Sequence, residues 1–237
     1  MMSMRYYPLF LDLAEARCLV VGAGRVGRRK IATLLECRPS SVLVLDPWMT
    51  EADAAELVAL APGILHCERR AFAPQDIEGM TLAFAATPSA EANAAMARLC
   101  RASGVLCNVA GPLEEGASGN FIVPAHVEDG PLVLALSTSG GSPALARALK
   151  EDLQRWLSHG YSRLVILLEA LRPRLLALGL GSDADAEIFR AICARPVRDS
   201  LMEALARGDA KAADKLLRPI LPASLSFTAE EILHVLD

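Results

Sequence analysis

The feature that most constrains the fold of this chain is a glycine-rich turn between a short apolar run and a helix-forming segment. The apolar run covers residues 17–21 (RCLVV), and good helix formers follow over 28–35. In a dinucleotide-binding βαβ unit, the first glycine permits a tight bend, the second lets the backbone approach a pyrophosphate, and the third lets helix and strand pack closely. The amides at the helix start would then face the phosphates. The turn therefore predicts cofactor-binding residues at Gly22, Gly24, Arg25, Val26 and Gly27.

Further apolar runs downstream predict a parallel sheet. They lie at 42–45 (VLVL), 82–86 (LAFAA) and 105–109 (VLCNV), with helix-forming segments at 51–60 and 90–101 between them. Continuous rather than alternating apolarity is typical of a parallel strand that is covered on both faces. The alternation of strands and helices predicts an α/β fold, a Rossmann-type doubly wound sheet over residues 1–118.

An acidic residue at the end of the second strand indicates which dinucleotide binds. Asp46 lies about twenty residues beyond the turn, where a carboxylate accepts hydrogen bonds from ribose hydroxyls and repels a 2′-phosphate. We therefore expect NAD rather than NADP, with Asp46 and the adjacent Pro47 among the cofactor-binding residues. A basic cluster keeps NADP open as an alternative, although it would equally suit a solvated helix face; it comprises Arg25, Arg28, Arg29 and Lys30.

Two polar residues follow later strands of the predicted sheet. Thr87 comes after the run 82–86, and Asn108 lies near the end of the run 105–109. Ligands bind outside the carboxyl ends of strands in doubly wound folds, so both are predicted to contact the cofactor. Each would alternatively serve as an ordinary turn or cap residue.

The character of the sequence changes after residue 118. Apolar runs at 121–125 and 132–136 flank a turn, which predicts a strand pair that needs cover from another element. A second subunit is one candidate for that element. A helix is predicted to start at Ser142-Pro143, with an apolar stripe of Leu145, Leu149, Leu153 and Trp156. We therefore expect an NAD-binding domain at 1–118, a strand-rich dimerisation segment at 119–142 and a helical domain at 143–237.

Composition narrows the partners and the compartment. The net charge of −4 argues against nucleic acid or an anionic membrane as the main partner, and a small molecule is the better expectation. Neither a membrane-spanning run of roughly 20 apolar residues nor a signal peptide is recognisable, so we expect a cytoplasmic protein. The six cysteines and four histidines lack the spacing of metal ligands, and no metal site is predicted.

Several motifs together resemble the precorrin-2 dehydrogenase and sirohydrochlorin ferrochelatase family, which includes a module of siroheme synthase. They occur in order through about the first 155 residues: YPLFLDL, VGAGRVGRRK, AFAATPSAEAN, CNV, NFIVPA and LALSTSGGSPALARALKEDL. The resemblance implies NAD-dependent oxidation of precorrin-2 to sirohydrochlorin, iron insertion in some members, and a homodimer.

The sequence departs from the family pattern at one position. Members commonly carry an aspartate three residues after the asparagine of CNV, for which roles in dehydrogenation and chelation are proposed, but this chain has Gly111. Glu114 and Glu115 are the candidate replacements as catalytic carboxylates, although a solvated acidic loop would explain them equally. Ferrochelatase activity is therefore in doubt. The alternatives are a non-catalytic NAD-sensing module and a bifunctional dehydrogenase and ferrochelatase.

A hydroxyl-rich turn precedes the predicted helix at Pro143. Ser137, Thr138 and Ser139 stand beside Gly140-Gly141, and helix amides lie just beyond them. Such groups suit carboxylates, of which precorrin-2 carries many, so these three residues are the predicted substrate-binding residues. A capped turn explains Ser142 but not the run before it.

Overall fold

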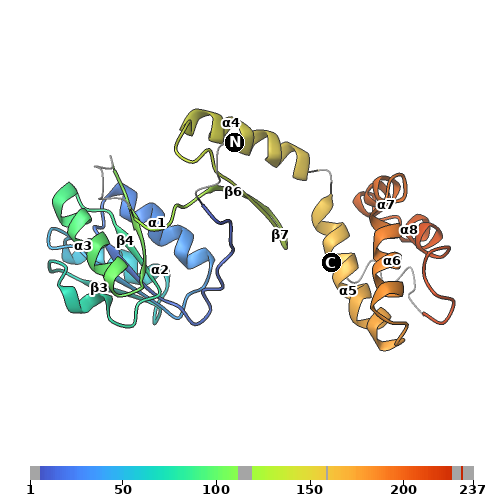
Figure 1. Cartoon of the computed structure of the whole chain (residues 1–237), viewed down its shortest axis with the longest axis horizontal. Helices are drawn as coiled ribbons and strands as arrows, with labels where there is room; N and C mark the ends of the chain where they lie inside the picture. Colours follow the sequence, from blue (N-terminus) through green and yellow to red (C-terminus); the bar gives the residue numbers. More distant parts are fainter. Residues whose placement is uncertain (1–5, 112–118, 159, 226–230, 232–237) are drawn as a thin grey trace. The chain divides into compact units, whose positions relative to one another are not determined.

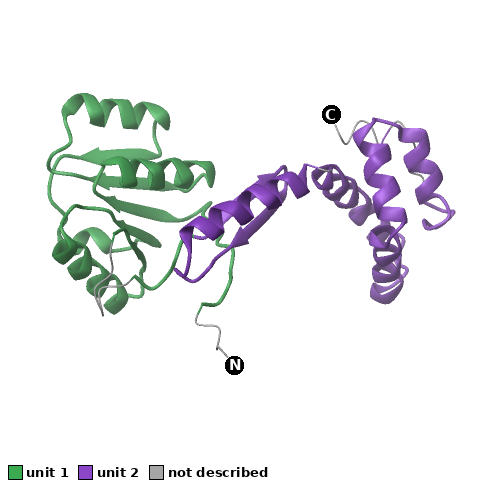
Figure 2. Ribbon diagram, turned by 90° about the horizontal axis from the view of Figure 1, so that it is seen from above, with its two compact units in different colours: residues 1–123 green, residues 124–237 purple. Residues whose placement is uncertain are grey.

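The computed structural model describes residues 6–111, 119–158, 160–225 and 231. The chain divides into two compact units, residues 1–123 and 124–237 (Figure 2). The division falls at 123/124, whereas the sequence predicts boundaries at 118/119 and 142/143. That three-part division remains a prediction.

Unit 1, drawn in blue and green in Figure 1, is built on a five-stranded parallel sheet. The order of its strands is β3-β2-β1-β4-β5. Its strands are β1 (Arg17–Val21), β2 (Ser41–Leu45), β3 (Leu65–Glu68), β4 (Leu82–Ala85) and β5 (Leu106–Val109). The chain moves from β1 outward to β3, then crosses back to β4 on the other side of β1. This reversal places a topological switch point at the carboxyl ends of β1 and β4, where doubly wound folds bind ligands. The predicted α/β fold is confirmed.

Helices cover both faces of this sheet. α1 (Arg25–Glu36) and α2 (Glu51–Leu60) bury Ile31, Leu34 and Leu57 against one face. On the other face, α3 (Ala90–Ala102) and the 3-10 helix η1 (Pro74–Ile77) form a second core. Side chains of β1 alternate between the two cores, which is why its apolarity is continuous.

Unit 2 begins with an antiparallel strand pair, β6 (Ala125–Asp129) and β7 (Leu132–Leu136), joined at Gly130-Pro131. The prediction of a strand over 121–125 was wrong in its position, because residues 121–124 lie outside any strand. The Phe121 ring instead packs edge-on against Phe84 of β4 at 5.7 Å between centroids, so its apolar character serves the core of unit 1.

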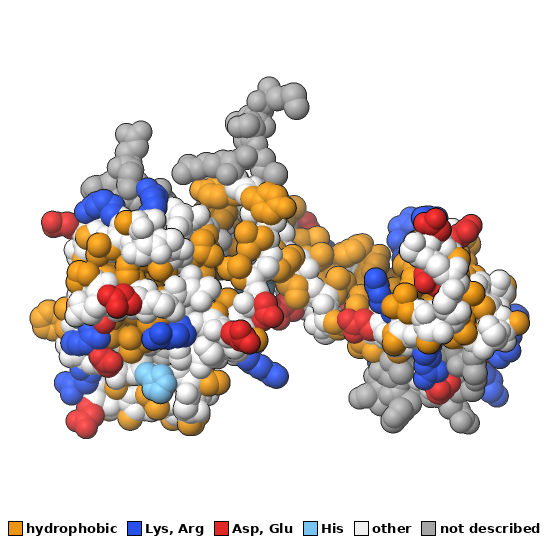
Figure 3. Space-filling model, turned by 60° about the horizontal axis from the view of Figure 1, so that its bottom comes forward, with side chains coloured by type: hydrophobic (Ala, Val, Ile, Leu, Met, Phe, Trp, Pro, Cys, Tyr) orange, Lys and Arg blue, Asp and Glu red, His pale blue; other side chains and the backbone are white. Residues whose placement is uncertain are grey.

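The rest of unit 2 is helical. Its helices are α4 (Pro143–Leu157), α5 (Tyr161–Ala177), α6 (Ser182–Cys193), α7 (Val197–Ala206) and α8 (Ala210–Leu217). A core of leucines from α5 packs against α6, α7 and α8, and its fully buried members include Leu167, Leu171 and Leu175. On the face of the molecule drawn in Figure 3, both units carry acidic and basic side chains with hydrophobic side chains between them.

The predicted stripe on α4 is present, but it stays largely uncovered. Leu145 and Leu149 are 51% and 39% exposed, and Leu157 is the helix residue that is buried. The ring of Trp156 lies against Tyr161, with 4.2 Å between centroids. Within the described residues, no helix is long and apolar enough to cross a membrane.

Candidate functional site

The three glycines of the turn after β1 have different structural roles. Gly22 has φ +101°, and a Cβ there would lie 2.5 Å from the carbonyl oxygen of Ala86. A Cβ on Gly27 would lie only 1.8 Å from the carbonyl oxygen of Gly22, so α1 packs directly on the turn. At Gly24 a Cβ would meet nothing within 4 Å. Gly22 and Gly27 are therefore required by packing, whereas Gly24 borders open space that a pyrophosphate can enter.

The start of α1 is suited to an anion. No side chain caps the helix at Gly24, and its first turn contains no acidic residue. The first amides of a helix have no intrahelical acceptor, and the helix dipole adds partial positive charge there. Phosphate groups bind at such helix starts, so the turn fits the pyrophosphate of a dinucleotide.

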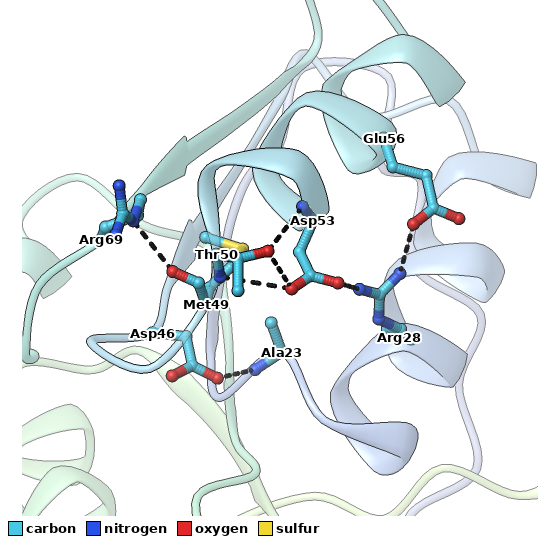
Figure 4. A network of polar contacts seen from close by, with 8 residues as sticks. All are labelled: Ala23, Arg28, Asp46, Met49, Thr50, Asp53, Glu56 and Arg69. Atoms are coloured by element: carbon cyan, nitrogen blue, oxygen red, sulfur yellow. Dashed lines mark hydrogen bonds and ion pairs between the residues drawn. The ribbon is translucent and has the colours of Figure 1, made fainter.

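Asp46, at the end of β2, connects the glycine turn to the next loop. One carboxylate oxygen accepts a hydrogen bond from the amide of Ala23 at 2.7 Å (Figure 4). The other accepts from the amide of Trp48 at 2.9 Å. Each carboxylate oxygen has further acceptor capacity, so ribose hydroxyls can still donate to Asp46. The structure adds a role that the sequence did not indicate, because Asp46 also fixes the turn itself.

The basic cluster on α1 is partly committed to contacts within the protein. Arg28 pairs with Asp53 of α2 at 2.6 Å and with Glu56 at 3.5 Å (Figure 4). Hydrogen bonds from Thr50 and the pairing with Arg28 hold the pKa of Asp53 below its ordinary value. Nζ of Lys30 lies 5.5 Å from the centre of the Phe84 ring, and burial lowers the pKa of its ammonium. Arg25 and Arg29 are exposed.

Thr87 holds the turn between β4 and α3. Its hydroxyl lies 2.7 Å from Oδ1 of Asn93, whose amide nitrogen donates to the Thr87 carbonyl at 2.9 Å. Asn93 is only 3% exposed. The sequence did not single out Asn93, although an asparagine one turn inside a serine-capped helix is a signal for such a contact. A cofactor contact by Thr87 stays a prediction.

Asn108 lies beside a segment that runs along the outer edge of β5. Its amide nitrogen donates to the carbonyl oxygen of Phe121 at 3.2 Å. The backbone amide of Asn120 donates to the carbonyl oxygen of Cys107 in β5 at 2.9 Å, and the Asn120 side chain accepts from the amide of Cys107 at 2.7 Å. A Cβ on Gly119 would lie 2.1 Å from the Cys107 carbonyl oxygen, so the segment approaches β5 closely. The amide of Asn108 therefore helps to hold this segment, and its cofactor role stays a prediction.

The position where the family commonly has an aspartate has an unusual backbone. Gly111 has φ +113°, a conformation that residues with side chains rarely adopt. An aspartate at this position would be strained in the present backbone conformation, although its Cβ would meet nothing within 4 Å. The candidate replacements Glu114 and Glu115 lie outside the described residues.

The hydroxyls of the turn before α4, residues 137–142 of unit 2, are used within the turn. Ser142 caps α4 by accepting from the amide of Leu145 at 3.1 Å. The Thr138 hydroxyl bonds to the backbone of Ser142, and Ser137 accepts from the amide of Ser139 at 3.0 Å. These hydrogen bonds account for the hydroxyl residues at 137–139, which the capping of α4 by Ser142 does not explain. Substrate binding by Ser137, Thr138 and Ser139 stays a prediction.

No group of three or more potential metal ligands is found within the parts of the chain that the structure describes. All six cysteines are free thiols.

Comparison with known proteins agrees with this geometry. Residues 9–125 match a family described as putative NAD(P)-binding. The siroheme synthase of Chromobacterium violaceum is 35% identical over 210 residues, which are 87% of this chain and 43% of that protein. Siroheme synthase 1 of Halorhodospira halophila is 34% identical over 73% of this chain and 34% of its own length. The chain therefore spans less than half the length of these relatives.

A solved structure shares the fold. It is that of SirC, precorrin-2 dehydrogenase, with a TM-score of 0.70 and 24% identity over 91% of this chain and 98% of that one. The family resemblance indicated by the sequence motifs is confirmed. The chain is thus a homologue of the siroheme synthases and belongs to the same family, with an NAD(P)-binding domain at residues 9–125.

Proposed function

We propose that this protein oxidises precorrin-2 to sirohydrochlorin with NAD as the acceptor. The observation that carries the proposal is the glycine turn at the switch point of the sheet, where Gly24 borders open space beside Asp46. This arrangement supports dinucleotide binding. The substrate is inferred from the relatives, which are named siroheme synthases and precorrin-2 dehydrogenase.

The residues of unit 1 would bind and orient the cofactor. The backbone at Gly24 and the start of α1 would hold the pyrophosphate, and Asp46 would accept hydrogen bonds from the ribose and disfavour a 2′-phosphate. Arg28 is already paired with Asp53 and Glu56, which supports NAD over NADP. When bound, NAD supplies the hydride acceptor, and positioning of the macrocycle against it would provide much of the rate.

A carboxylate would assist the loss of the accompanying proton. We assign this role to Glu114 or Glu115, because Gly111 cannot supply it. The variant Glu114→Ala/Glu115→Ala tests the assignment when oxidation and metal insertion are measured separately. Slower oxidation is expected, and unchanged rates of both reactions would clear both acids of a catalytic role.

The direct test of the activity is anaerobic incubation with precorrin-2 and NAD. NADH and the absorption spectrum of sirohydrochlorin should appear together, and NADP should support a slower reaction. If neither product appears when precorrin-2 and NAD were both intact at the start of the incubation, the proposed reaction is wrong.

The second candidate is a module that binds NAD without turnover, favoured by the absence of a carboxylate at Gly111. Tight NAD binding in calorimetry, beside unchanged precorrin-2, would support it, and any turnover would eliminate it.

A bifunctional enzyme is the third candidate. Its test is the addition of ferrous iron or cobalt to sirohydrochlorin, with metal insertion as the readout.

We also propose a homodimer with contacts through α4. Leu145 and Leu149 form an exposed apolar stripe, and exposed stripes of this kind mark interaction surfaces. The double variant Leu145→Glu/Leu149→Glu should sediment as a monomer, whereas Arg147→Glu on the opposite side of the helix should stay dimeric. A monomeric parent chain would overturn this proposal.

We also propose a cytoplasmic location, because six free thiols suit a reducing compartment.

The hydroxyl turn at 137–142 would contribute to substrate binding. Ser137 and Ser139 are exposed beside the start of α4, where carboxylate groups of precorrin-2 can be accommodated. Ser139→Ala should raise the KM for precorrin-2 while leaving the KM for NAD unchanged. An unchanged KM for precorrin-2 would argue against this role.

A further inference from the structure

Trp48 has the most exposed large apolar side chain among the described residues. It is 88% exposed, compared with 46% for Trp156. Tryptophan is strongly buried on average, because its indole has the largest apolar area of any side chain. Such exposure suggests a surface that a ligand covers.

Trp48 lies directly beside the carboxylate that is proposed to hold the ribose. It follows β2 by three residues, and its amide donates to Oδ1 of Asp46 at 2.9 Å. The other oxygen of Asp46 accepts from Ala23 in the glycine turn at 2.7 Å. A single carboxylate therefore ties the backbone of Trp48 to the turn that faces the pyrophosphate.

The loop that carries Trp48 is fixed on its far side as well. The neighbouring Met49 is buried, and its carbonyl oxygen accepts from Nε of Arg69 at 2.9 Å (Figure 4). Thr50 and Asp53 then form a reciprocal capping box at the start of α2. The backbone that carries the indole is thus held in place before a ligand binds, so less conformational entropy of the protein is lost on binding.

We propose that Trp48 is the stacking surface for the adenine ring of the bound dinucleotide. The inference rests on the proposed dinucleotide site and names the residue that recognises its adenine end. Adenine is joined directly to the ribose that Asp46 would hold, so the base would emerge beside the indole. Stacking of a nucleobase on an aromatic side chain contributes substantially to affinity, and each side chain that stacks needs a free face. The 88% exposure of Trp48 provides one.

The chain allows a direct optical test, because it contains only two tryptophans, Trp48 and Trp156. In the variant Trp156→Phe, Trp48 is the only indole, and in Trp48→Phe the only indole is Trp156. The probe is ADP-ribose, which carries the adenine end of the dinucleotide but lacks the nicotinamide. Energy transfer from an indole to a nicotinamide therefore does not contribute to the quenching. ADP-ribose should quench the emission of Trp156→Phe saturably and leave that of Trp48→Phe unchanged. Nicotinamide mononucleotide, which lacks adenine, should quench neither.

Affinity provides an independent measurement. By calorimetry, Trp48→Ala should raise the Kd for ADP-ribose about tenfold, and Trp48→Phe, which keeps a smaller ring, should raise it less. Trp156→Phe is the matched control and should leave the Kd unchanged. Because Trp48 is exposed, its replacement should not alter the far-ultraviolet circular dichroism spectrum, which checks the fold.

Three results would overturn the inference: no binding of ADP-ribose, binding that leaves the emission of Trp48 and the Kd of Trp48→Ala unchanged, or emission of Trp48 that follows protein concentration instead of ligand. The last would assign the indole to a contact between copies of the chain. None of these measurements involves precorrin-2. Quenching without precorrin-2 oxidation would overturn only the proposed activity, and oxidation without quenching would overturn only the role of Trp48.

Discussion

Within the described residues, two turns join a strand to a helix through glycines, and they are held in different ways. The turn from β1 to α1 is fixed by backbone packing, with a Cβ position on Gly27 only 1.8 Å from a carbonyl oxygen. The turn from β7 to α4 is fixed by hydroxyls, and a Cβ on its Gly140 would meet nothing within 4 Å, so glycine is favoured there by its φ of +86° and not by packing. Backbone packing therefore requires glycine in the first turn, whereas backbone conformation and hydroxyl hydrogen bonds shape the second.

A third turn lies between these extremes. At η1, between β3 and β4, the buried carboxylate of Asp76 accepts from the amide of Ala73 at 2.7 Å and from both terminal nitrogens of Arg70 at 2.8 Å. The turn is held by a side chain, as before α4, but that side chain is buried. The three turns should differ in the free energy of unfolding that a single substitution costs.

The largest effect is expected for Gly27→Ala. Its added methyl group would overlap the Gly22 carbonyl oxygen, so helix and turn must separate, with a loss of about 3 kcal/mol in the free energy of unfolding. Urea denaturation measures this loss. Gly24→Ala is the matched control, because its methyl group enters open space; it should cost less than about 1 kcal/mol but weaken NAD binding. Equal losses for the two variants would contradict the packing argument.

An intermediate effect is expected for Asp76→Asn. Hydrogen bonds and charge from Arg70 lower the pKa of Asp76, so its contribution to stability is present above the unfolded pKa and is lost as pH falls through the lower native value. At neutral pH we expect a loss of about 2 kcal/mol, less than for a fully buried pair because the Arg70 side chain is 40% exposed. The difference from the parent chain should shrink below about pH 4.

The control for Asp76→Asn is Glu68→Gln. Glu68 pairs with the same arginine at 2.6 Å, but its side chain is 49% exposed. Exposed pairs contribute less than about 1 kcal/mol. Denaturation curves recorded from pH 3 to pH 7 compare the two variants, and a loss for Asp76→Asn that does not change with pH would exclude the charge as its cause.

The smallest effect is expected for Ser142→Ala in the hydroxyl turn. Loss of the cap on the Leu145 amide should cost about 1 kcal/mol, because water can reach the exposed helix start and satisfy the amide. Thr50→Ala, which removes the corresponding cap of α2, should cost a similar amount. Thermal unfolding measures both, and a loss for Ser142→Ala as large as that of Gly27→Ala would remove the distinction between the two kinds of turn.

Much of unit 1 could be predicted from the sequence because its signals are local. Continuous apolar runs marked β1, β2, β4 and β5, since each strand is covered on both faces. The misplaced strand at 121–125 shows the limit of this reasoning. An apolar run shows that side chains are buried, but the partner that buries Phe121 is Phe84, far away in the sequence.

By itself, the sequence determined the glycine turn and the strand and helix that flank it, because Gly22 and Gly27 meet backbone atoms that only glycine can approach so closely. The tertiary structure decided what the surrounding polar side chains do. Asp46 bonds to Ala23, Arg28 pairs with Asp53, and Asn108 bonds to Phe121, across 23, 25 and 13 residues of sequence. Composition and spacing fix which groups are available, but hydrogen bonds and ion pairs need atoms within about 3 Å, and only the folded chain brings those atoms together.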